Sequence, residues 1–176
     1  MAYFENFPRI KYDFTARGDI NPIVEVIQDT TTKINMFITN EDLENLCFRY
    51  TIKVGELPEH ISQNYYKTPE LAWTILFVNS IGNLNNEWPL TDLKLIDYVS
   101  KIYGVSNINA VHHYEKLPEN IAMDSQFVID NYGINALNTV TNLDYETSLN
   151  EYKRMIYVIK KEYINTFTKQ YLNLLV

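Results

Sequence analysis

The chain has 176 residues, a formal net charge of −7 and a single cysteine, Cys47. The acidic balance argues against general binding to nucleic acid or to an anionic membrane surface, because both need a basic protein surface. One cysteine excludes an intrachain disulfide and is typical of a reducing compartment. Residues 1–6 lack the character of a signal peptide, and no apolar run approaches the roughly 20 residues of a membrane span.

The first 46 residues predict an N-terminal extended arm. Pro8, Gly18 and Pro22 divide this region into short segments. A strand is expected over residues 34–38, and residues 40–42 predict a turn or the start of a helix.

Residues 47–104 have the clearest pattern. Residues 47–54 alternate in polarity like a half-buried strand, and Gly55 ends them. Pro58 predicts the first position of a short helix, where the missing N–H of proline costs nothing. Thr68 predicts the N-cap of a second helix that ends before Asn79. This second helix is apolar nearly all round, so we expect it to be buried.

A third helix is expected after Trp88, with Thr91 as its cap and Gly104 at its end. Its apolar residues recur at helical spacing and predict one buried stripe, formed by Leu95, Ile96, Val99, Ile102 and Tyr103.

Residues 105–176 predict a C-terminal region of strands and helices. Extended segments are expected over residues 111–115 and 126–129, and a helix over residues 144–153. Residues 155–159 are β-branched and aromatic, which favours a strand before a final helix over residues 162–175. Because no Gly or Pro interrupts this stretch, one long helix from residue 144 to residue 175 is the alternative.

The sequence contains no strong catalytic signal. His113 and Glu115 would share one face of a strand beside His112, but the spacing indicates no third metal ligand. Cys47 lies in an apolar strand, where a buried, inert thiol is expected. Serine-hydrolase, phosphate-binding and dinucleotide-binding motifs are missing from the sequence. We therefore predict no catalytic residue, no metal ligand, no cofactor and a role other than that of an enzyme.

The middle region resembles a LysM module. The resemblance follows the chain order of one strand, a turn and two helices: Tyr50, Ile52, Lys53–Glu56, Ile61, Tyr65, Tyr66, Trp73, Ile75, Val78, Asn79 and Ile81. It implies an α+β fold with a strand-helix-helix core, and a shallow groove that binds N-acetylglucosamine polymers such as peptidoglycan. The residues of that groove would be Gly55, Glu56, Asn79, Ile81, Gly82 and Asn83. The chain departs from the module after Trp88, where a helix is expected instead of a closing strand.

The whole chain resembles the small baseplate wedge protein of contractile-tailed bacteriophages, which carries a LysM-like middle. The matching segments follow one another along the chain: residues 7–14, 68–73, 87–90, 112–115, 140–146 and 150–154. The predicted division is an N-terminal arm over residues 1–46, a LysM-like domain over 47–104 and a C-terminal region over 105–176.

The resemblance implies a structural role in the virion. Such a protein is assembled in the host cytoplasm into the tail baseplate, where it joins neighbouring wedges through contacts with other wedge proteins. The expected partners are therefore proteins, with no nucleic acid and no membrane. The alternatives are a peptidoglycan-binding module that acts at the host cell wall and a cell-wall hydrolase, for which the sequence indicates no pair of carboxylates.

Overall fold

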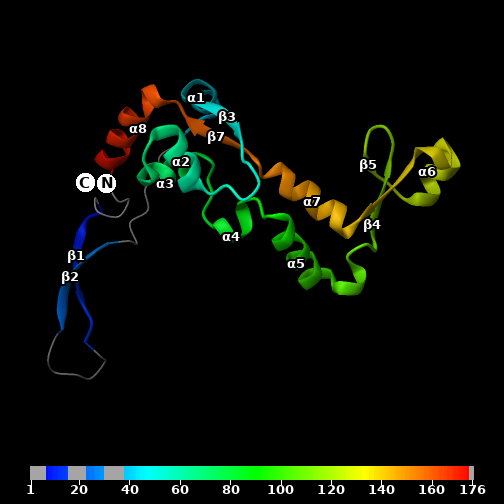
Figure 1. Cartoon of the computed structure of the whole chain (residues 1–176), viewed down its shortest axis with the longest axis horizontal. Coiled ribbons are helices and arrows are strands. Elements are labelled where there is room, and N and C mark those ends of the chain that lie inside the picture. Colours follow the sequence, from blue (N-terminus) through cyan, green and yellow to red (C-terminus); the bar gives the residue numbers. More distant parts are fainter. Residues whose placement is uncertain (1–6, 16–22, 30–37, 175–176) are drawn as a thin grey trace. The chain divides into compact units, whose positions relative to one another are not determined.

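The computed structural model describes residues 7–15, 23–29 and 38–174 (Figure 1). It has an α+β fold, as predicted, and forms two discontinuous units. The first unit contains Met1–Tyr50, Glu56–Gly82 and Ile156–Val176, and the second contains Thr51–Gly55 and Asn83–Met155. The three consecutive ranges expected from the sequence differ from these units, because the chain returns to the first unit after residue 155.

The first unit contains most of the N-terminal helices and strands and the last strand and helix of the chain. They are β1 (Arg9–Asp13), β2 (Val24–Gln28), α1 (Asn40–Leu46), β3 (Cys47–Thr51), α2 (Pro58–Tyr66), the 3₁₀ turn η2 (Pro69–Leu71), α3 (Ala72–Val78), β7 (Met155–Ile159) and α8 (Lys161–Asn173). The strand predicted over residues 34–38 lies almost entirely outside the described residues, and Ile38 itself belongs to no strand.

Local capping signals explain where these helices begin. The Thr39 hydroxyl accepts a hydrogen bond from the backbone N–H of Asp42, and the Asp42 carboxylate bonds back to Thr39, which completes a capping box for α1. Pro58 is the first residue of α2, as predicted. The predicted cap at Thr68 is confirmed, since its hydroxyl accepts a hydrogen bond from the Glu70 N–H.

Strand β7 pairs with β3, and this pairing completes a strand-helix-helix-strand connectivity in the first unit. The Lys160 N–H donates to the Leu46 carbonyl at one end, and the Ile52 N–H donates to the Arg154 carbonyl at the other. These bonds show that the two strands are antiparallel. The predicted strand over residues 155–159, between two helices, is therefore confirmed, and the single long helix is excluded.

The core of the first unit lies between α3, α8 and the β3–β7 pair. Cys47, Val78, Ile159, Ile164 and Phe167 form its buried cluster. Cys47 is 4% exposed, and burial raises the pKa of its thiol to about 11, so the predicted inert thiol is confirmed as buried.

A second cluster of this unit joins Phe7 to the C-terminal helix. Phe7 and Tyr171 are buried together, with Trp73 and Phe77 packed against them. The Trp73 ring centroid is 4.5 Å from that of Tyr171. The chain is thus held at Phe7, immediately before the β1–β2 hairpin begins.

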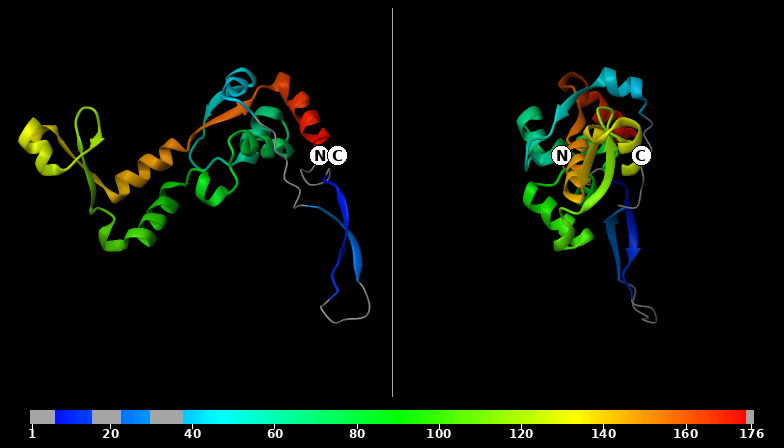
Figure 2. Two further views of the ribbon diagram at one scale, coloured as in Figure 1. Left: turned by 180° about the vertical axis from the view of Figure 1, so that it is seen from behind. Right: turned by 90° about the vertical axis from the view of Figure 1, so that its right-hand side faces the viewer.

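The second unit contains the short helix α4 (Leu84–Glu87) and a three-stranded antiparallel sheet in the order β5–β4–β6. Its other elements are α5 (Asp92–Tyr103), η3 (Val105–Asn107), β4 (Val111–Lys116), β5 (Ile121–Ala122), α6 (Ser125–Tyr132), η4 (Ile134–Ala136), β6 (Leu137–Thr141) and α7 (Asn142–Tyr152). In Figure 2 the sheet and α6, lime to yellow, lie side by side.

The side-chain amide of Asn150 and the buried ring of Trp88 stabilise the second unit. The Asn150 amide donates to the Leu90 carbonyl and accepts from the Leu90 N–H, at 2.9 and 2.7 Å. Trp88 is 4% exposed, which decides that it is a core residue rather than a surface contact.

Two predictions for this unit need correction. Residues 126–129 belong to helix α6 rather than to a strand, because the Asp124 carboxylate caps the helix by accepting from the Phe127 N–H at 3.0 Å. The predicted stripe of α5 is only partly buried: Leu95 and Val99 are in the core, whereas Ile96 and Ile102 are 45% and 53% exposed.

Candidate binding sites

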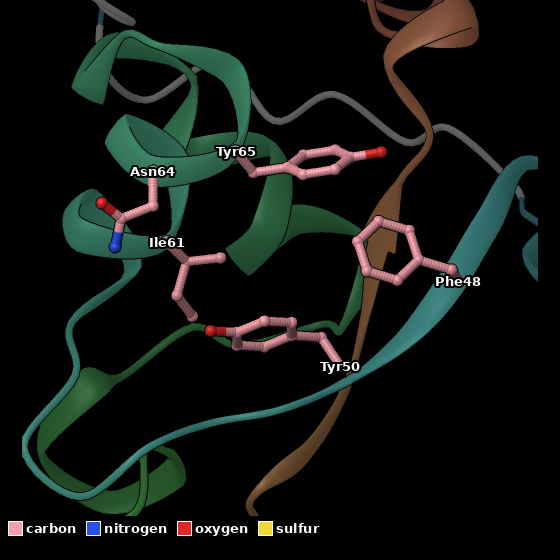
Figure 3. Close-up of a pocket in the computed structure, with 5 residues that line it drawn as sticks. All are labelled: Phe48, Tyr50, Ile61, Asn64 and Tyr65. Carbon is pink, nitrogen blue, oxygen red and sulfur yellow. The ribbon is translucent and has the colours of Figure 1, made fainter.

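A pocket lined by three aromatic rings lies between β3 and α2 of the first unit (Figure 3). Residues two apart on a strand share a face, so β3 presents Phe48 and Tyr50 to the pocket. Residues three and four apart on a helix also share a face, so α2 presents Ile61, Asn64 and Tyr65. Figure 3 shows the Tyr50 and Tyr65 rings on opposite sides of the space, with Phe48 closing a third side. These five residues, named here the aromatic pocket, enclose about 220 Å³.

Two charged groups lie beside the aromatic pocket, the Glu56 carboxylate and the Lys161 ammonium. The Tyr50 hydroxyl donates to the Glu56 carboxylate, 3.0 Å from each oxygen. Burial and this carboxylate raise the pKa of Tyr50 above its ordinary value. The Lys161 ammonium lies 4.8 Å from the centroid of the Tyr65 ring. Within residues 7–15, 23–29 and 38–174, no carboxylate forms an ion pair with Lys161.

A second, larger pocket of the first unit lies along α3. It encloses about 500 Å³ and is lined by Glu59, Ala72, Trp73, Leu76, Phe77, Ile81 and Gly82. Ile81 and Gly82 belong to the predicted glycan groove, so the structure brings two of those six residues to one cavity.

The polar residues predicted for the glycan groove are bonded within the chain. The Asn79 amide donates to the carbonyls of Ile75 and Tyr157, at 2.7 and 2.8 Å, and accepts from the Tyr157 N–H at 2.8 Å. Glu56 is 9% exposed and accepts from Tyr50, as described above. Asn79 and Glu56 therefore each have a structural role in the first unit.

The two remaining groove residues, Gly55 and Asn83, belong to the second unit. Gly55 has a φ of +73°, a backbone conformation that side-chain-bearing residues rarely adopt. The Asn83 side chain accepts a hydrogen bond from the Asn85 N–H and caps α4. No observation tests the glycan groove as a whole, and it stays a prediction.

His113 and Glu115 lie on one face of β4, as predicted. The His113 Nε2 atom lies 3.2 Å from the Glu115 carboxylate. A register shift between Val111 and His113 marks a β-bulge, which brings the adjacent ring of His112 against His113, with their Nδ1 atoms 2.8 Å apart. The His112 ring also stacks on Tyr145, 4.0 Å between centroids. In the described part of the chain, no three His, Cys, Asp or Glu side chains gather at a geometry that could hold a metal ion.

The β1–β2 hairpin carries an uncovered apolar face. Directly opposite residues of antiparallel strands share a face, and Ile10 pairs with Ile27 while Tyr12 pairs with Glu25. Phe14 donates to the Ile23 carbonyl and extends the same face. The face that these six residues form, five of them apolar and one the exposed Glu25, is named here the hairpin face. Ile10, Tyr12, Phe14 and Ile23 are 38% to 54% exposed.

Comparison with known proteins adds no family to these observations. Neither the known protein-family models nor the curated protein sequences include a match to this chain. Among the helices of the described residues, none is both long and apolar enough to span a membrane.

The aromatic pocket was not predicted from the sequence, although the sequence contains the pattern of both of its faces. The alternation of β3 and the four-residue spacing of Ile61 and Tyr65 were both visible. The sequence does not predict that these two faces meet, because their contact depends on how α2 packs against β3.

Proposed function

We propose that this protein is a structural subunit of a contractile phage tail baseplate wedge, which binds other wedge proteins and joins neighbouring wedges. The ordered resemblance along the chain to the small baseplate wedge protein supports the identity of the assembly. The strand-helix-helix-strand connectivity of the first unit is also consistent with a LysM-like core. In this role the LysM-like core is a scaffold that carries protein-binding surfaces.

The uncovered hairpin face is the observation that carries a protein-binding role. A two-stranded hairpin is at best marginally stable alone in water, because it buries little apolar surface. Here Tyr12 and Phe14 pack edge to face at 4.8 Å, yet each remains about half exposed. A contiguous apolar face of this kind is typical of a surface that another protein covers. The hairpin is therefore suited to dock on a partner.

Exposed apolar side chains of the second unit support a further protein contact. Leu93, Val105 and Tyr152 are 82%, 79% and 86% exposed. A subunit that joins two neighbours in a ring needs two different binding surfaces, since each contact is heterologous. The hairpin face and this second group of side chains meet that requirement on separate parts of the chain.

The decisive experiment blocks this gene in the phage that carries it and images the infected lysate by electron microscopy. Free wedges without complete baseplates would support the proposal. Complete, normal particles would overturn it, and normal particles that adsorb but infect poorly would favour the peptidoglycan-binding alternative.

A pair of variants tests whether the hairpin face is the joining surface. Complementation with Tyr12→Ser and Phe14→Ser together is expected to leave free wedges. Complementation with Lys11→Ser, on the opposite face of the same strand, is expected to restore baseplates. Equal restoration by both would show that the hairpin face is not required.

A further inference from the structure

We propose that the aromatic pocket binds one aromatic side chain of a partner protein, and that this side chain lies next to a carboxylate of the same partner. The identity of the partner as a protein rests on the proposed function. The aromatic pocket shares no residue with the hairpin face and contains none of the residues predicted for the glycan groove.

The size of the aromatic pocket fits one ring. An apolar cavity of about 150 Å³ is known to accommodate benzene in another protein. The aromatic pocket encloses about 220 Å³, which leaves room for a phenol or an indole. Buried aromatic anchors of this size contribute much of the binding energy at protein interfaces.

The arrangement of the lining suits a planar guest. The Phe48 and Tyr65 rings lie 5.0 Å apart between centroids at an interplanar angle of 54°, within the range of tilted aromatic contacts. Figure 3 shows the space between Tyr50 and Tyr65 bounded by their rings, with Ile61 opposite Phe48. A ring inserted there would contact aromatic or aliphatic carbon on all four sides.

The charges beside the aromatic pocket favour an anion next to that ring. The Glu56 carboxylate is buried and accepts from the Tyr50 hydroxyl at both oxygens. The exposed Lys161 ammonium lies over the Tyr65 ring and has no ion-pair partner within the described ranges. A carboxylate of the partner would pair with Lys161, whereas a cationic guest would be repelled by it.

A sugar ring is the less suitable guest. Sugars also stack on aromatic faces, but their hydroxyl groups need several hydrogen-bond partners once they are buried. The Tyr50 hydroxyl already donates to Glu56. The side chains that line the aromatic pocket offer, besides Tyr50, only the Asn64 amide and the Tyr65 hydroxyl.

The test uses the whole chain, ¹⁵N-labelled, in an NMR titration with N-acetyl-tryptophan, which carries a carboxylate, and with its neutral amide. Chemical-shift changes are expected at β3 and α2 at millimolar concentrations. The neutral amide should bind roughly two- to fivefold more weakly, the range of one exposed ion pair. Lys161→Gln should abolish this preference, while the matched control Lys169→Gln, an exposed lysine of the same helix, should keep it.

Three outcomes would overturn the inference. The first is that N-acetyl-tryptophan produces no chemical-shift change at β3 and α2. The second is that Lys161→Gln keeps the preference for N-acetyl-tryptophan over its neutral amide. The third is that a soluble N-acetylglucosamine tetramer shifts β3 and α2 whereas N-acetyl-tryptophan does not. Because Lys161 is exposed, its variant is expected to fold, which circular dichroism would check. If the titration fails while the gene-block experiment still yields free wedges, only the ligand assigned to the aromatic pocket is wrong. Normal particles in that experiment would remove the proposed function itself.

Discussion

Replacing Asn79 with alanine is expected to destabilise the first unit through the loss of one side chain that holds β7. In a strand, the N–H and C=O groups of one residue point to the same edge. The Asn79 amide bonds both groups of Tyr157, as a neighbouring strand would, and also bonds the Ile75 carbonyl at the end of α3. Asn79→Ala therefore removes three hydrogen bonds and leaves both Tyr157 groups without this partner.

The magnitude follows from those three bonds. At about 1 kcal/mol for each, the free energy of unfolding should fall by about 3 kcal/mol. In a chain of 176 residues this corresponds to a decrease in Tm of roughly 6 to 12 °C. Asn79→Asp should cost at least as much, because a carboxylate would face the two carbonyl oxygens to which the amide now donates.

Guanidinium and thermal unfolding, followed by circular dichroism, measure this effect. Asn165→Ala is the matched control, since Asn165 is exposed on α8 and its side chain forms no hydrogen bond to the residues described here. If Asn79→Ala and Asn165→Ala unfold at the same denaturant concentration, the role assigned to Asn79 is wrong.

Three further perturbations test the core, the thiol and a helix cap. Trp73→Ala should lower the free energy of unfolding by about 3 kcal/mol, because its ring packs against Tyr171, while Tyr152→Ala at an 86% exposed position should change little. Cys47 should resist alkylation at pH 8 in the folded chain and react quickly in denaturant; equal rates would refute its burial. Burial raises the pKa of the thiol from 9.0 to about 11, so the free energy of unfolding relative to Cys47→Ala should fall by roughly 3 kcal/mol as the pH rises from 9 to 11, because the unfolded state loses the thiol proton first. Thr141→Ala should cost about 1 kcal/mol in chemical denaturation, because it removes the hydroxyl that caps α7, and an unchanged midpoint would contradict this.

The starts of several helices and the position of some strands could be predicted from the sequence, because local interactions determine them. Thr68 bonds a backbone group two residues away, and Pro58 has its backbone φ fixed by its own ring. The β-branched and aromatic run of β7 likewise predicted a strand with the correct bounds, 155–159.

Pairing and exposure were decided only by the tertiary structure. The Tyr66 hydroxyl donates to the Ile159 carbonyl across 93 positions, and no spacing rule along the chain predicts that β7 returns to this place. The same limit applies to α5, where helical periodicity predicted a full stripe but packing covers Leu95 and Val99 and leaves Ile96 exposed. A pattern of residues shows which face can be buried, whereas the arrangement of the other elements decides which part of that face is covered. For this protein, local chemistry determined the elements, and contacts between distant segments determined the closed β3–β7 pair and the aromatic pocket.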